Sequence, residues 1–266
     1  DGLLYPEEVV EWAYRIGLRA ISITDHDTVS GIDRALYALK NTNLLEIIPG
    51  VELNTDYFGE EIHMLGYCIN YKNPRFLNIL KKMQQARYDR ALKIIQKLND
   101  LNIMITMEQV KKLAKGSSIG RPHIAQAMLK GGYISNIKDA FDKYIGKGQL
   151  AYVERFKLES KQAIEIINSI GGVPVLAHPG LIKNKSIISS VIDLGIQGIE
   201  VYHTKHNKDT IRYLNSIAKE KKLLITGGTD CHGIMINNKP ILGSVTISYN
   251  KVVLLKNIAK NYIDKK

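Results

Sequence analysis

The pattern that most constrains the fold is an alternation of strand-like and helix-like segments at both ends of the chain. Near the start, a helical pattern at residues 6–16 precedes strand-like runs at 18–24, 43–53 and 60–69. Near the end, strands predicted at 173–179, 196–203 and 223–233 alternate with helices predicted at 160–172, 186–195 and 209–222. This alternation predicts an α/β fold with βαβ units around a mostly parallel sheet or barrel.

The segment between these two parts has a different pattern. Amphipathic helical patterns are present at residues 73–101, 106–114 and 120–133, and no strand-like run of comparable strength interrupts them. We therefore expect an all-helical insertion at 72–150. It would separate a first part of the barrel at 1–71 from a second part at 151–266.

The positive charge of the chain lies in this same segment. Residues 71–150 contain 16 Lys/Arg and 5 Asp/Glu, whereas the rest contains 21 of each, so the segment carries the whole net charge of +11. Such asymmetry favours an anionic partner, and a set of solvated Lys-rich helices is the alternative.

Only two cysteines are present, and no apolar run approaches the roughly 18 residues of a membrane span. We expect a cytoplasmic protein with no membrane association and no obligate protein partner.

Histidine and acidic residues recur where the predicted strands end. They are Asp25, His26, Asp27, Glu52, His63, His178, His203, Asp230 and His232. A single histidine at such a place is usually structural, but five of the seven histidines fall at these ends. Functional groups of a parallel α/β fold gather at the C-terminal ends of its strands. The set therefore predicts a multinuclear metal site, and imidazole and carboxylate ligands without thiolates suit Mn, Fe or Zn.

Individual positions suggest roles within this site. Glu52 can bridge two metals, because one carboxylate can give an oxygen to each. Asp230 and His232 lie two residues apart, so their side chains share one face of an extended strand. Asp25 and Asp27 flank His26 and either orient ligands from behind or serve as turn and cap residues. Clustered metals activate water and stabilise charge on a phosphoryl group, which predicts phosphoester hydrolysis.

Seven motifs, taken in order, carry a family resemblance. They are "ITDHDTVSGI", "PGVEL", "HMLGY", "GRPHIAQAM", "VLAHPG", "GIEVYH" and "GGTDCHG". As a set they resemble the polymerase-and-histidinol-phosphatase (PHP) superfamily of metal-dependent phosphoesterases. They are most similar to its bacterial branch of nucleoside 3′,5′-bisphosphate phosphatases and 5′→3′ exoribonucleases.

The resemblance implies a distorted (β/α)7 TIM-like barrel that holds up to three divalent metal ions, with manganese expected first and zinc or iron as alternatives. The implied ligands are Asp1, His26, Glu52, His63, His178, Asp230 and His232. One metal would take Glu52 and Asp230 with an HxH pair expected upstream of residue 1. The second metal would take Asp1, His26 and His232. The third would take Glu52, His63 and His178.

The resemblance also implies the reaction and the substrate contacts. A metal-bound hydroxide at the trinuclear site would attack phosphorus, with Glu52, Asp230 and His232 as the catalytic residues. Arg121 and His123 in "GRPH" would face the substrate; alternatively, Arg121 pairs with a nearby acid. His203 and His206 in "VYHTKH" would contact the phosphate or leaving group, or are ordinary rim histidines.

We therefore expect hydrolysis of phosphate esters in nucleotides or short RNA or DNA. Two alternatives stay open. One is a small phosphomonoesterase of the histidinol-phosphatase kind. The other is a nucleic-acid-binding module whose metal site is inactive.

Overall fold

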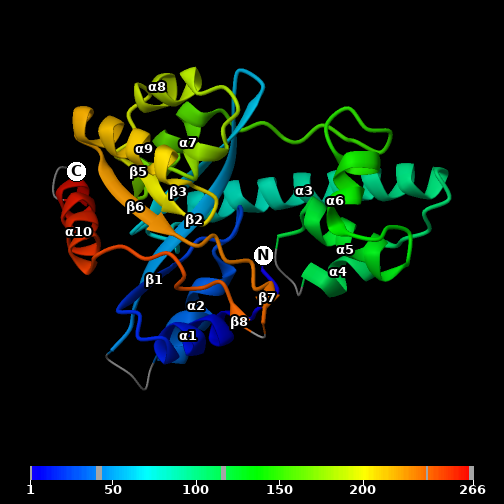
Figure 1. Ribbon diagram of the computed structural model, residues 1–266, viewed down its shortest axis with the longest axis horizontal. Coiled ribbons are helices and arrows are strands. Elements are labelled where there is room, and N and C mark those ends of the chain that lie inside the picture. Colours follow the sequence, from blue (N-terminus) through cyan, green and yellow to red (C-terminus); the bar gives the residue numbers. More distant parts are fainter. Residues whose placement is uncertain (1, 40–43, 115–117, 238, 264–266) are drawn as a thin grey trace. The chain divides into compact units, whose positions relative to one another are not determined.

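The computed structural model describes residues 2–39, 44–114, 118–237 and 239–263 (Figure 1). Within it the chain forms two compact units. The sheet unit comprises Gly2–Leu77 and Lys157–Lys266, and the helical unit comprises Asn78–Phe156. Each unit is described separately below.

The sheet unit is built on six strands in a single mixed sheet of order β1-β2-β3-β4-β5-β6. These are β1 (Ala20–Ile23), β2 (Glu46–Tyr57), β3 (Glu60–Tyr67), β4 (Val173–Leu176), β5 (Gly198–His203) and β6 (Leu224–Gly228). A separate pair, β7 (Met235–Ile236) and β8 (Lys239–Pro240), is antiparallel. The α/β class is confirmed, and six strands, rather than seven, join the sheet within the described residues.

The sheet is less parallel than expected. β1-β2, β4-β5 and β5-β6 are parallel, whereas β2-β3 and β3-β4 are antiparallel. The cause is local, because β2 and β3 are joined by only Phe58 and Gly59. Both residues have positive φ, at 49° and 86°, which is the backbone of a type I′ hairpin turn. A tight hairpin forces an antiparallel pair.

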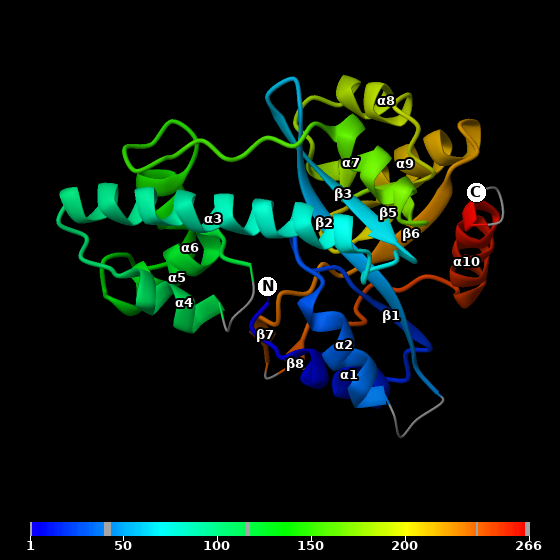
Figure 2. The ribbon, with the colours of Figure 1, turned by 180° about the vertical axis from the view of Figure 1, so that it is seen from behind.

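Helices flank this sheet in Figures 1 and 2. They are α1 (Pro6–Arg15), α2 (Ser30–Ala38), α7 (Ser160–Ser169), α8 (Ser186–Ile192), α9 (Lys208–Glu220), α10 (Tyr249–Ile263) and the short 3-10 helix η3 (Pro179–Leu181). α1 and α2 lie side by side, α7 packs on β2, β3 and β4, and α9 packs on β5 and β6. α1 shows why such segments are helical: Pro6 opens it, Glu7 and Glu8 occupy its first turn, and Arg15 its last.

The core beneath one face of the sheet is aliphatic. Its buried members are Ile48, Leu65, Val173, Val175, Ala177, Leu224, Leu255 and Ala259. They come from β2, β3, β4, β6 and α10, so the last helix closes over strands from both halves of the sequence. This packing fixes the strands that carry the functional side chains; Glu52 and His63 lie within β2 and β3 rather than at the strand ends expected from the sequence.

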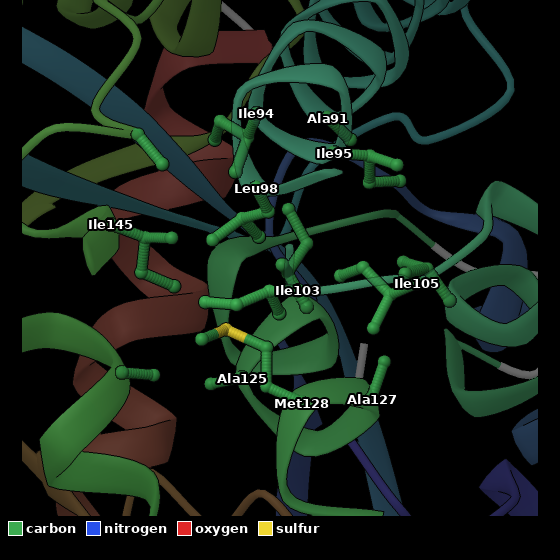
Figure 3. Close-up of a cluster of buried hydrophobic side chains, with 14 of the residues drawn as sticks. Ala91, Ile94, Ile95, Leu98, Ile103, Ile105, Ala125, Ala127, Met128 and Ile145 are labelled. Carbon is green, nitrogen blue, oxygen red and sulfur yellow. The ribbon is translucent and has the colours of Figure 1, made fainter. Parts of the chain in front are cut away.

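The helical unit contains helices and connecting loops, and no strand, within its described residues. The helices are α4 (Met107–Ala114), α5 (Arg121–Lys130), α6 (Ile137–Ala140), the π-helical turn η2 (Phe141–Ile145) and most of α3 (Pro74–Asp100). The unit has its own core, in which Leu98, Met128 and Ile145 are fully buried (Figure 3). Among the described helices, none is both long and apolar enough to cross a membrane.

Leu98 tests whether this core stabilises the helical unit. Leu98→Ala should lower the free energy of unfolding by about 2–5 kcal/mol, because it leaves a cavity at a fully buried position. Leu92→Ala on the same helix should cost much less, since Leu92 is 42% exposed. Chemical denaturation of both variants measures the difference. Equal losses would contradict the proposed core.

Candidate metal centre

The expected ligands within the described residues all come from β2, β3 or the segments that follow other strands of the sheet unit. His26 follows β1, and Glu52 and His63 lie in β2 and β3. His178 follows β4, and Asp230 and His232 follow β6. Asp1, the remaining expected ligand, lies outside the described residues. The sheet thus gathers side chains that are up to 206 positions apart in the sequence, from His26 to His232.

Three of these side chains meet at one point. The Glu52 Oε1 atom lies 2.9 Å from His63 Nδ1 and 3.0 Å from His178 Nε2. The two imidazole nitrogens are themselves 3.1 Å apart. Sheet register explains the first contact, because His63 pairs with Asn54, which lies two residues from Glu52 on the same face of β2.

The second oxygen of Glu52 faces another histidine. His26 Nε2 lies 3.6 Å from Glu52 Oε2. A backbone bridge between His26 and Glu52 fixes this approach, since Asp27 N donates to Glu52 O and Glu52 N donates to Asp25 O. Ligand atoms of His26, Glu52 and His63 all lie within 4.8 Å of one another. Glu52 therefore presents its two oxygens to different groups, as a bridging carboxylate would.

Asp230 and His232 continue the cluster on the side of β6. His232 Nδ1 is 3.5 Å from Asp230 Oδ1, and its ring centroid is 6.4 Å from that of His26. On the other side of Asp230, His203 Nε2 lies 3.7 Å from Oδ2. His203 is only 2% exposed, so this imidazole is enclosed behind the carboxylate.

The charges in the cluster depend strongly on one another. Burial alone would raise the pKa of Glu52, which is 5% exposed, but His26, His63 and His178 hold it well below its usual value. Burial opposes the charged form of His63 as well, yet the Glu52 carboxylate raises the pKa of His63 to about 10. Glu52 is therefore an anion that needs a cation beside it, which protons on imidazoles or a metal ion can supply.

The donor set fits a divalent metal. A metal with ligand bonds of about 2.1 Å at right angles holds adjacent donor atoms about 3.0 Å apart. The triangle formed by Glu52 Oε1, His63 Nδ1 and His178 Nε2 has edges of 2.9, 3.0 and 3.1 Å. Two imidazoles and one carboxylate on one face are also a known metal-binding combination.

Two acidic residues that the sequence reasoning missed support these ligands. Glu61 Oε1 lies 3.6 Å from His63 Nε2, on the side of the ring away from Glu52. Glu200, in the middle of β5, accepts a hydrogen bond from His178 N at 2.8 Å. Burial, together with the nearby Glu52 and Asp230 charges, raises the pKa of Glu200 to about 8. Glu61 lies two residues before His63, which was a usable signal, whereas Glu200 lies within an ordinary strand pattern.

The four expected substrate contacts fall into two groups. Arg121 and His123 lie at the start of α5 in the helical unit. There, His123 Nδ1 accepts from Gly120 N at 3.1 Å, and the Arg121 guanidinium lies 5.6 Å from the Phe141 ring centroid. His203 and His206 lie in the sheet unit, with ring centroids 5.1 Å apart, and the His203 ring is 5.6 Å from that of His178.

Comparison with known proteins identifies the family. Residues 1–169 match the family model described as PHP domain. The chain belongs to the PHP family. It is 33% identical to a 5′-3′ exoribonuclease of Haemophilus influenzae over 87% of this chain and 86% of that protein. It is 26% identical to a 3′,5′-nucleoside bisphosphate phosphatase of Chromobacterium violaceum, over 87% and 83%.

A solved structure agrees with the activity of these relatives. A candidate metal-dependent phosphoesterase of Bifidobacterium adolescentis superposes with a TM-score of 0.88 at 28% identity, over 97% of this chain and 92% of that one. The family resemblance of the sequence motifs is confirmed, and the PHP protein described here is a hydrolase of phosphate esters.

Glu200 gives a test of the electrostatics in metal-free protein. Its pKa is raised from about 4.5 when unfolded to about 8 when folded, so its charge opposes folding increasingly as pH rises between those values. Glu200→Gln keeps an acceptor for His178 N and removes that charge. The variant should gain stability relative to wild type, by up to a few kcal/mol, as pH rises from about 5 to 8. Urea denaturation with a chelator present measures this difference, and a constant difference would contradict it.

Proposed function

We propose that this PHP protein is a metal-dependent phosphatase or 5′→3′ exonuclease acting on nucleoside 3′,5′-bisphosphates or short oligonucleotides. The observation that carries the proposal is the triangle of donor atoms from Glu52, His63 and His178, in which Glu52 is a buried anion. Family membership supplies the reaction class, and the named activities of the relatives suggest the substrate class.

The metal would be held by the ligand set expected from the sequence. His63, His178 and Glu52 Oε1 suit one ion. Asp1, His26 and His232 would hold a second, and Glu52 and Asp230 would contribute to a third. Divalent ions bound here would activate water and stabilise negative charge on the phosphoryl group. Three ions, with manganese first among them, are part of the proposal. The proposal also includes the (β/α)7 barrel and the division of the chain into a first barrel part at 1–71, an insertion at 72–150 and a second barrel part at 151–266.

The side chains around the ligands would keep this site ordered. His203 lies behind Asp230, and Glu61 lies behind His63, so these two ligands each have a neighbour that would orient them. Glu52 and His203 are buried, which limits the access of water to these two side chains. The proposal assigns catalytic roles to Glu52, Asp230 and His232.

Substrate preference would come from the helical unit. Residues 71–150, most of which lie in the helical unit, carry the whole net charge of +11, which favours a substrate with several phosphates over a small monoester. Arg121 could grip a phosphate with two parallel hydrogen bonds, and His123 would support the same helix start.

Because Cys68 and Cys231 are both free thiols, we also propose that the protein lies in the cytoplasm.

A substrate panel tests the proposed function. With Mn²⁺ and the full-length protein, kcat/KM for a nucleoside 3′,5′-bisphosphate or a 5′-phosphorylated RNA pentamer should exceed that for histidinol phosphate at least about tenfold. Glu52→Gln should abolish all of these activities and lower bound metal in elemental analysis. Equal or better turnover of histidinol phosphate would overturn the nucleotide assignment. Salt-sensitive RNA binding without hydrolysis would favour a binding module.

Arg121 can be separated from the metal ligands. Arg121→Ala should raise KM for the phosphorylated substrate about 10–100-fold, because a charge-assisted contact is lost, while metal content stays unchanged. Lys130→Ala removes the same charge from the exposed far end of α5 and is the matched control. Metal loss in Arg121→Ala, or equal effects of the two variants, would refute a specific phosphate contact.

A further inference from the structure

The turn that carries His178 has an unfavourable backbone. His178 follows β4 with φ of 26° and ψ of 55°, in the left-handed region that non-glycine residues rarely adopt. The 3-10 helix η3 begins immediately after it. Such a conformation persists only when surrounding groups hold it. What holds this turn therefore determines where the His178 imidazole points.

Hydrogen bonds hold the turn on both sides of His178. The Glu200 carboxylate accepts from His178 N at 2.8 Å, and His206 Nε2 accepts from Gly180 N at 3.1 Å. Lys185 Nζ donates to Gly180 O at 2.7 Å. Lys185 Nζ also donates to Pro179 O within the turn, whereas the second backbone bond of His206 ties it to Val201 in β5, outside the turn.

That second bond sets the tautomer of His206. Its Nδ1 lies 2.8 Å from Val201 O, a carbonyl that can only accept, so Nδ1 carries the hydrogen. The Nε2 atom is then left with a lone pair for Gly180 N–H. His206 is 8% exposed, and burial lowers its pKa, so the ring stays neutral and keeps both roles.

Gly180 makes room for this contact. A Cβ atom at Gly180 would lie 2.4 Å from His206 Cδ2 and 2.6 Å from Nε2. Only glycine lets the backbone approach the imidazole closely enough for the hydrogen bond. Gly180 and His206 therefore act as a matched pair.

We propose that His206 is a positioning residue: by accepting from Gly180 N–H, it locks the turn so that His178 Nε2 faces Glu52 and His63. The role in metal binding rests on the proposed function above. This positioning role takes the place of the direct phosphate contact expected for His206 from the sequence, because both ring nitrogens are already hydrogen-bonded to the backbone. His203 differs, since its Nδ1 accepts from Lys205 N and its Nε2–H has no hydrogen-bond partner among the described residues.

Two amide variants test the proposal, because each copies one nitrogen of the imidazole. In His206→Asn the amide reaches Val201 O but not Gly180 N–H. In His206→Gln it reaches Gly180 N–H. Titration of the full protein with Mn²⁺ alone should show an affinity about 10–100-fold weaker in His206→Asn, and close to wild type in His206→Gln. The Mn²⁺-binding event that is weakened should be the same one that disappears in His178→Ala.

A neighbouring residue supplies the stability control. Asn207 caps α9 by accepting from Thr210 N, and it has no described bond to the 178–181 turn. Asn207→Ala should lower the melting temperature as a lost helix cap does, yet leave Mn²⁺ affinity unchanged. A similar loss of affinity in Asn207→Ala would mean that His206 acts only through general stability, which would overturn the proposal.

Imidazole NMR of metal-free protein provides a readout that needs no metal. Long-range ¹H–¹⁵N spectra should show His206 neutral with its hydrogen on Nδ1, and Gly180→Ala should disturb that signal. Hydrogen on Nε2 would overturn the proposal. Unchanged Mn²⁺ affinity in His206→Asn would also overturn it while leaving the proposed function intact. A wild-type protein that binds no Mn²⁺ would overturn both.

Discussion

The buried carboxylate of Glu52 is the interaction on which the candidate centre depends. An isolated carboxylate in this position would cost several kcal/mol, so it needs cationic or hydrogen-bonding neighbours from other strands. His63 reaches it only because Asn54 pairs with His63 across the hairpin. A slip of one residue in that register would turn His63 to the opposite face of β3. The register of the hairpin and the electrostatics of the site therefore stabilise each other.

A second layer of polar groups follows from the same constraint. Each imidazole near Glu52 uses one nitrogen toward the cluster, so its orientation depends on what holds the rest of the residue. Glu61 faces the far nitrogen of His63, and Glu200 holds the backbone of His178. Burial and the nearby charges of Glu52 and Asp230 raise the pKa of Glu200. A cation bound in the cluster would offset the repulsion from those two charges. The charge states of the candidate ligands and of the acidic residues that hold them, such as Glu200, would therefore change together when a cation binds in the cluster.

The sequence was sufficient for what depends on residue type and periodicity, and insufficient for what depends on three-dimensional contacts. The strand ends that precede His26 and His178 were predicted because apolar runs stop there, whereas the expected strand end at Glu52 was wrong, since β2 continues to Tyr57. The antiparallel pairing of β2 and β3 was not, because it depends on the positive φ of Phe58 and Gly59. Glu200 was missed because it alternates with apolar neighbours like any strand residue. His203 and His206 looked equivalent in "VYHTKH", and only their backbone partners distinguish them.

The two compact units suggest how one chain can combine two requirements that conflict. A cluster of buried histidines and carboxylates needs a rigid support, which the sheet unit provides through an aliphatic core shared by β2, β3, β4, β6 and α10. The proposed surface for a highly charged substrate would need many exposed cations, which repel one another and would weaken that support if they surrounded it. Residues 71–150 contain that excess charge, and the helical unit has a separate core around Leu98 and Met128. The candidate metal ligands thus belong to the unit with one core, and most of the excess charge belongs to the unit with the other.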